Sequence, residues 1–348
     1  MKNMKIRNKK RYLISNQIIL LFSLYLLSAS QVFANVKPSI ERELSSLFVR
    51  AKLAPATDER LFCSVPKQKY KSNYPHADYL LNIAEAEHLV IFVHGFIPDK
   101  FGGEHSFDGL VDVWQHHINI AKKVDNTAYC VVTWNTEYGH DDERNTLTYF
   151  LYAYYLATSN IRKSIRYQKP TLTIVGHSAG GNYIKYSYLF AKSAFEEVNK
   201  KLKRGLYINA ETRIVTLGTP HLGTSFANDA AMYVFMGQAF AYLYESKGLA
   251  RGLSGFGKKA YSRGANLLKP VSKNPKLKEL NYYFSKIFPK KDLFAVGSNI
   301  DNYVDKASAT PYFSTPFTLN VSHEDFLKPK VRSNFYRFLE TLYKGGRP

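Results

Sequence analysis

The 348-residue chain contains only two cysteines, and they do not form a C-x-x-C pair. It is therefore not a small protein held together by a disulfide framework, and it lacks the thiolate ligands of a structural zinc site. Acidic residues are also few, with 28 Asp and Glu against 48 Lys and Arg, giving a formal net charge of +20. Such a basic chain could meet nucleic acid, an anionic membrane surface or an acidic substrate, and charge alone does not choose among them.

The N-terminal segment is basic and then apolar. Residues 1–16 hold six basic and no acidic side chains, and the apolar run Ile18–Leu27 that follows is shorter than the roughly 20 residues of a membrane-spanning helix. Val32-Phe33-Ala34 then offers small side chains at the spacing of a cleavage site. These features predict a signal peptide over residues 1–34 and export to the periplasm or the medium. An uncleaved amphipathic anchor is the alternative.

Export affects how the two cysteines are interpreted. An oxidising compartment permits a disulfide between Cys63 and Cys130. The alternative is that Cys130, inside the apolar run AYCVVTW, is a buried small hydrophobe. Export also makes nucleic acid a less favoured partner.

Short apolar runs alternate with helical patterns along the chain. We expect buried strands and helices in this alternation to form a mainly parallel sheet covered by helices on both faces, an α/β fold. The expected strands are 89–93, 129–134, 172–175, 214–217 and 293–296, and the expected helices are 146–167, 179–199 and 331–343. Ligand sites of such sheets lie at the carboxyl ends of the strands.

One strand leads directly into a candidate catalytic turn. The sequence Gly176-His177-Ser178-Ala179-Gly180 follows the strand 172–175 and precedes the helix 179–199, which is the context that G-x-S-x-G requires. Glycines two residues on either side of the serine let strand and helix pass closely. Ser178 is therefore the candidate nucleophile, and a chance glycine-rich turn is the alternative.

A second motif follows the first strong strand, at Val93-His94-Gly95-Phe96. A serine acyl-transfer enzyme needs two N–H donors for the oxyanion, commonly the amide after the nucleophile and one from the loop after this early strand. We therefore nominate the amides of Ala179 and Phe96. His94 itself is expected to be a hydrogen-bonded scaffold residue and not a base.

Three strings together resemble a known family. VHGF at 93–96, GHSAGG at 176–181 and TLGTPHLGT at 216–224 are similar to the α/β-hydrolase superfamily, in particular its secreted lipases and esterases, and the third string is also similar to GPI inositol-deacylase-like hydrolases. The resemblance implies an α/β-hydrolase catalytic domain over 88–348, preceded by an N-terminal extension over 35–87. It also implies a serine ester hydrolase without a cofactor or metal.

The family order of Ser, then acid, then His selects the remaining partners. His323 follows a strand-like run and precedes the last helix, so we expect it to be the base, whereas His221 would have to precede the acid. Asp301 is favoured as the acid because the family pattern has a carboxylate shortly after the strand 293–296. Asp305 is its rival.

The region before the acid-bearing strand is long. Residues 226–290 form an expected insertion and candidate lid, with an apolar half at 230–244 and a basic half. The stretch Lys247–Lys291 holds twelve basic residues and one acid, Glu279, which favours an anionic membrane surface. A buried helix followed by a solvated loop is the alternative.

We therefore expect a lipase or carboxylesterase acting on lipid esters. A phospholipase or acyltransferase and a catalytically silent binding domain are the alternatives. The sequence carries no signal for an oligomeric state.

Overall fold

The computed structural model describes residues 61–66, 75–95, 111–134, 146–161, 169–201, 206–225 and 268–348. The predicted signal peptide, Phe96 and most of the predicted insertion (226–267) lie outside these ranges. None of the helices within the described ranges is long and apolar enough to cross a bilayer.

A seven-stranded sheet forms the centre of the described fold, with the strand order β1-β3-β2-β4-β5-β6-β7. All neighbouring strands are parallel except β1, which runs antiparallel to β3 at one edge. The strands are β1 (Leu61–Ser64), β2 (His88–Val93), β3 (Thr127–Val132), β4 (Thr171–His177), β5 (Glu211–Leu217), β6 (Leu293–Ser298) and β7 (Thr315–Leu319). The predicted α/β fold class is confirmed.

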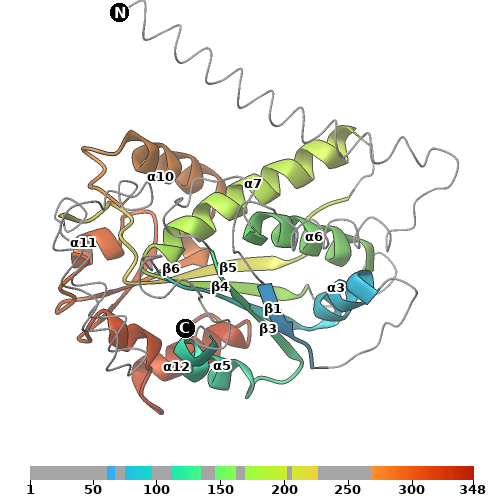
Figure 1. Ribbon diagram of the computed structural model, residues 1–348, viewed down its shortest axis with the longest axis horizontal. Coiled ribbons are helices and arrows are strands. Elements are labelled where there is room, and N and C mark those ends of the chain that lie inside the picture. Colours follow the sequence, from blue (N-terminus) through green and yellow to red (C-terminus); the bar gives the residue numbers. More distant parts are fainter. Residues whose placement is uncertain are drawn as a thin grey trace, which may run out of the picture.

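Helices cover both faces of this sheet (Figure 1), which is why the central strands are largely buried. The helices are α3 (Pro75–Glu85), α5 (Gln115–Ala121), α6 (Thr146–Ile161), α7 (Gly180–Lys201), α10 (Pro275–Ile287), α11 (Lys306–Ala309) and α12 (Asn334–Tyr343). One core cluster joins α3, α6, α7 and α10 to one face, and a second joins α5 and α12 to the other. The aromatic run of α6 belongs to the first core, with Phe150, Tyr154 and Tyr155 fully buried.

The described part of the segment 35–87 packs with the sheet. β1 adds an edge strand to the sheet, and a disulfide joins Cys63 on β1 to Cys130 on β3, its partner in the register. Leu80 and Ile83 of α3 are buried in the same core as α6. The hydrophobic core therefore continues across residue 87, and the boundary expected there stays a prediction.

The register places several loops at one end of the sheet. Val93 of β2 pairs with Gly176 of β4, and His177 pairs with Leu217 of β5. Leu217 in turn pairs with Val296 of β6. The loops after β2, β4, β5 and β6 consequently meet at the carboxyl ends of the strands.

Candidate active site

Ser178 lies on the tight turn between β4 and α7. Its φ is 51°, in the left-handed region that side chains seldom adopt, and its N–H donates to the carbonyl of Leu217 at 2.8 Å. A Cβ on Gly176 would lie 2.6 Å from Ile184 Cδ1, and one on Gly180 would overlap the His94 carbonyl oxygen. The glycines of the motif are thus required by the close passage of strand, helix and the loop after β2. The turn is strained in the way that a projecting nucleophile needs.

His323 is hydrogen-bonded to Asp301. The Nδ1–Oδ2 distance is 2.7 Å, and the Asp301 side chain is fully buried. The other carboxylate oxygen accepts the N–H groups of Tyr303 at 2.8 Å and Val304 at 3.0 Å. A carboxylate bound to Nδ1–H leaves Nε2 without a proton, which is the tautomer that a general base requires.

The charge of Asp301 is held by these bonds. Burial raises the pKa of its carboxyl group, but the His323 hydrogen bond and charge and the two backbone N–H donors outweigh burial, so the pKa lies below its ordinary value. Asp305, the rival acid, is exposed, and its carbonyl oxygen accepts the first N–H bonds of α11. The structure therefore brings Asp301, and not Asp305, to His323.

Two contacts of His177, and the close approach of Gly218, place His323 beside the turn that carries Ser178. Nε2 of His177 lies 3.0 Å from the carbonyl oxygen of His323, and the two imidazole centroids are 4.6 Å apart. A Cβ on Gly218, which follows the carbonyl that binds the Ser178 amide, would lie 3.0 Å from His323 Nδ1. Burial and the His323 charge lower the pKa of His177 to about 3. His177 therefore stays neutral and serves as scaffold.

The loop after β2 packs directly against the serine. A Cβ on Gly95 would lie 2.8 Å from Ser178 Cβ. His94 fixes this loop because its Nε2 accepts the backbone N–H of Trp134 at 3.1 Å, so that Nδ1 carries the proton that goes to the Gly95 carbonyl at 2.7 Å. Of the two nominated amides, Ala179 is buried beside Ser178, whereas Phe96 lies outside the described residues.

The loop 219–224 connects the nucleophile helix with the acid loop. Asn182 Nδ2 of α7 donates to the Pro220 carbonyl at 3.1 Å. At the other end Thr224 Oγ1 donates to the Tyr303 carbonyl at 2.6 Å, and Ser308 Oγ donates to the Gly223 carbonyl at 2.7 Å. This loop therefore holds Ser178 and Asp301 in a fixed relation.

Sequence reasoning missed two further residues that hold the loop 219–224 in place. Lys185 of α7 is fully buried and donates to Asn281 Oδ1 at 2.5 Å, while Asn281 Nδ2 donates to the His221 carbonyl at 2.6 Å. Burial lowers the pKa of Lys185 well below its ordinary value. The only local signal was a lysine within a largely apolar stretch of helix, and the partner on α10 had none.

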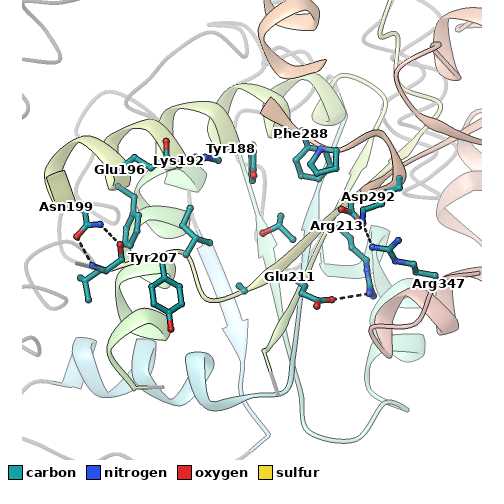
Figure 2. A pocket seen from close by; sticks show the side chains of 17 residues that line it. Tyr188, Lys192, Glu196, Asn199, Tyr207, Glu211, Arg213, Phe288, Asp292 and Arg347 are labelled. Atoms are coloured by element: carbon teal, nitrogen blue, oxygen red, sulfur yellow. Dashed lines mark hydrogen bonds and ion pairs between the residues drawn. The ribbon is translucent and has the colours of Figure 1, made fainter. Parts of the chain in front are cut away.

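A separate pocket lies at the opposite end of the sheet (Figure 2). It has a volume of about 570 Å³ and is lined by the first residues of β5, Glu211–Arg213, together with parts of α7 and the chain after α10. Arg347 and Asp292 pair at 2.8 Å beside it. Because Ser178 follows the last residue of β4, this pocket is not the catalytic one.

The sheet order, the elbow with Ser178 and the His323–Asp301 pair define an α/β-hydrolase. Residues 84–308 match the family model described as "Putative serine esterase (DUF676)", and the chain belongs to this family. The match includes Ser178 and Asp301 and ends before His323. No curated protein matches the chain.

Solved structures that match the chain include lipases and an esterase. The mature lipase BlEst2 of Bacillus licheniformis is 15% identical, with 82% of this chain and 98% of that chain covered and a TM-score of 0.47. Lipase 1 of Pelosinus fermentans is 13% identical, with coverage of 75% and 98% and a TM-score of 0.42. An esterase of Rhizomucor miehei is 15% identical, with coverage of 89% of each chain and a TM-score of 0.38.

Proposed function

We propose that the protein is an exported serine hydrolase that cleaves carboxylic esters of lipids through an acyl-enzyme on Ser178. The observation that carries the proposal is the 2.7 Å bond from His323 to the buried Asp301, beside the strained turn of Ser178. The family match to serine esterases supports the class of reaction. The lipid substrate is supported by the basic and apolar character of the region before β6.

In the proposed reaction, Nε2 of His323 removes the Ser178 hydroxyl proton as Oγ attacks the ester carbonyl carbon. The amides of Phe96 and Ala179 would bind the resulting oxyanion. The tetrahedral intermediate collapses, the C–O bond to the alcohol breaks, and His323 returns its proton to the leaving alkoxide. Water then attacks the acyl-enzyme with His323 again as base, which releases the carboxylic acid and restores Ser178.

Asp301 has an orienting role in this scheme. Its carboxylate holds the Nδ1–H tautomer of His323 and stabilises the imidazolium that forms in each step. The backbone N–H groups of Tyr303 and Val304 keep the carboxylate in place. No cofactor or metal takes part in the proposed chemistry.

Export is proposed on two grounds. Residues 1–34 have the charge and apolar pattern of a signal peptide. The Cys63–Cys130 disulfide suits an oxidising compartment. Expression in a Gram-negative host followed by mass spectrometry of the periplasmic protein tests the point. An N-terminus at Asn35 is expected, and a full-length membrane-bound chain would contradict it.

Turnover of p-nitrophenyl esters of increasing acyl length tests the substrate. We expect kcat/KM to rise from acetate to medium or long acyl chains and to vanish in Ser178→Ala. A preference confined to short soluble esters would contradict the lipid substrate while leaving the esterase in place. Faster acyl transfer to an added alcohol than to water would favour an acyltransferase.

A further inference from the structure

The helix α10 turns a mixed apolar and aromatic edge toward solvent. Its inner face packs on α7, where the rings of Tyr188 and Phe284 lie 6.1 Å apart. Tyr282, Tyr283 and Ile287 point outward, with exposed fractions of 59%, 42% and 46%. These are three of the eight large exposed hydrophobic residues within the described ranges. Such a concentration on one helix marks a surface that is suited to a partner.

Lysines surround these exposed side chains. Exposed lysines on α10 and on the turns before and after it are Lys273, Lys276, Lys278, Lys286, Lys290 and Lys291. Glu279 is the exposed acid among them, and Asp292, just beyond, is paired with Arg347. Lys286 Nζ lies 5.7 Å from the centre of the Tyr282 ring, so cation and aromatic ring occupy the same patch. The surface is therefore both cationic and partly apolar.

We propose that this surface, the outward side of residues 273–291, is a docking surface for an anionic lipid bilayer, and we name it the α10 face. Tyrosine rings suit the headgroup layer, and Ile287 can enter the outer part of the acyl chains. The aliphatic parts of the lysine side chains can lie against apolar groups while their ammonium groups stay among the headgroups. Phosphate groups of the lipids complement the lysines. A polyanion without an apolar layer would leave the exposed tyrosines and isoleucine unused.

The residues that lead into the α10 face are bound to the loop 219–224 at the catalytic end of the sheet. Val271 N–H donates to the Leu222 carbonyl at 2.9 Å, and Thr224 N–H donates to the Leu268 carbonyl at 2.8 Å. The same Thr224 side chain binds the loop that carries Asp301. From there α10 runs beside α7 (Figure 1). A bilayer on the α10 face would thus lie beside the loops that surround Ser178.

This docking rests on the proposed lipid esterase for its purpose, but it can be measured without catalysis. Binding of Ser178→Ala protein to vesicles is followed by co-sedimentation, using phosphatidylcholine alone and phosphatidylcholine mixed with phosphatidylglycerol. We expect binding only to the mixed vesicles, and weaker binding at high salt. If the wild-type protein hydrolyses no ester while the Ser178→Ala protein binds the mixed vesicles, the result would count against the proposed function and not against the α10 face.

Matched charge variants locate the surface. The test variant replaces Lys278, Lys286 and Lys290 with Gln, and the control replaces the exposed Lys169, Lys200 and Lys330 with Gln, so that net charge changes equally. We expect the test variant to bind mixed vesicles roughly tenfold to a hundredfold more weakly than the control. Equal binding of the two variants would overturn the proposal.

A second variant separates a bilayer from other anionic partners. Tyr282→Ser combined with Ile287→Ser leaves the charge unchanged, and both side chains are exposed, so the fold should be retained. This variant should lose vesicle affinity while its binding to heparin or duplex DNA stays as in the parent. Unchanged vesicle binding would show a surface that recognises phosphate charge alone, and would contradict bilayer docking.

Discussion

The Nδ1 atom of His323 and the Oδ2 atom of Asp301 lie 2.7 Å apart across 22 residues of sequence. Asp301 is reached from the end of β6, and His323 precedes the short 3₁₀ helix Glu324–Leu327. The carboxylate is buried and accepts two backbone N–H groups, so it is positioned before any substrate arrives.

Replacing Asp301 with Asn should lower kcat by roughly a hundredfold to ten-thousandfold, because an amide donor at this position favours the wrong tautomer of His323. The matched control is Asp305→Asn, because Asp305 is exposed and lies directly before α11. It should leave kcat nearly unchanged. Steady-state ester hydrolysis measures both, and a loss confined to Asp305→Asn would assign the acid to that residue.

The loop after β2 should be sensitive to a single methyl group. A Cβ at Gly95 would lie 2.8 Å from Ser178 Cβ and 3.2 Å from the His177 carbonyl oxygen, so Gly95→Ala must shift this loop away from the serine. Removal of one oxyanion donor typically costs a factor of about 10²–10³ in kcat. We expect a loss of this size with KM little changed. Wild-type kcat in a folded Gly95→Ala protein would show that the loop does not form the oxyanion hole.

The disulfide should stabilise the sheet edge. Cys63 and Cys130 are separated by 67 residues, and both are buried. On the chain-entropy model, a loop of this length contributes about 4 kcal/mol to the free energy of unfolding. The double variant Cys63→Ala, Cys130→Ala should therefore unfold at a lower urea concentration. The urea midpoint of the wild-type protein should fall by a similar amount once reductant is added. An unchanged midpoint in the double variant and in the reduced wild type would show that the disulfide does not stabilise the fold.

Stability should also decrease in mild acid because of a buried histidine. His117 is a buried residue of α5. Its Nδ1 is 2.8 Å from the Tyr343 hydroxyl of α12, and its Nε2 is 2.9 Å from the Phe326 carbonyl. Burial lowers its pKa to about 4. In the unfolded chain a histidine has a pKa of about 6.5, so between about pH 6.5 and 4 the unfolded state binds a proton and the folded state does not. Folding is therefore weakened progressively as pH falls from about 6.5 to about 4, by roughly 1.4 kcal/mol per pH unit for this residue.

Urea unfolding at pH 7 and in this acidic window measures the effect. His177 contributes in the same direction, since burial also lowers its pKa, to about 3. His117→Gln should reduce the pH dependence, whereas the same change at the exposed His116 should not. An identical pH dependence in the two variants would contradict the assignment.

The parts of the site that could be predicted from sequence have local signals. The glycines around Ser178 are required by the close passage of strand and helix, which their spacing indicates. The strands β2, β4 and β5 each contain a short run of apolar and β-branched residues. β1 was missed because it has four residues at an edge of the sheet, only one of them buried. The ties from Ser308 to the loop 219–224 and from Lys185 to Asn281 were also missed. They join positions far apart in the chain and leave no local pattern.

The choice between Asp301 and Asp305 shows the same limit. Both follow β6 within a few residues, so spacing does not separate them by itself. Asp301 differs from Asp305 because its carboxylate accepts the backbone N–H groups of Tyr303 and Val304. These bonds depend on the backbone conformation of the loop, which the sequence alone does not give.

The central claim is that Ser178 is a nucleophile activated by His323 and Asp301. Incubation with a fluorophosphonate, followed by peptide mass spectrometry, tests it most directly because the reagent requires only an activated serine. We expect one phosphonyl group on the peptide that contains Ser178, slower labelling in Asp301→Asn and none in Ser178→Ala. Folded wild-type protein that remains unlabelled, or is labelled at another serine, would contradict the account.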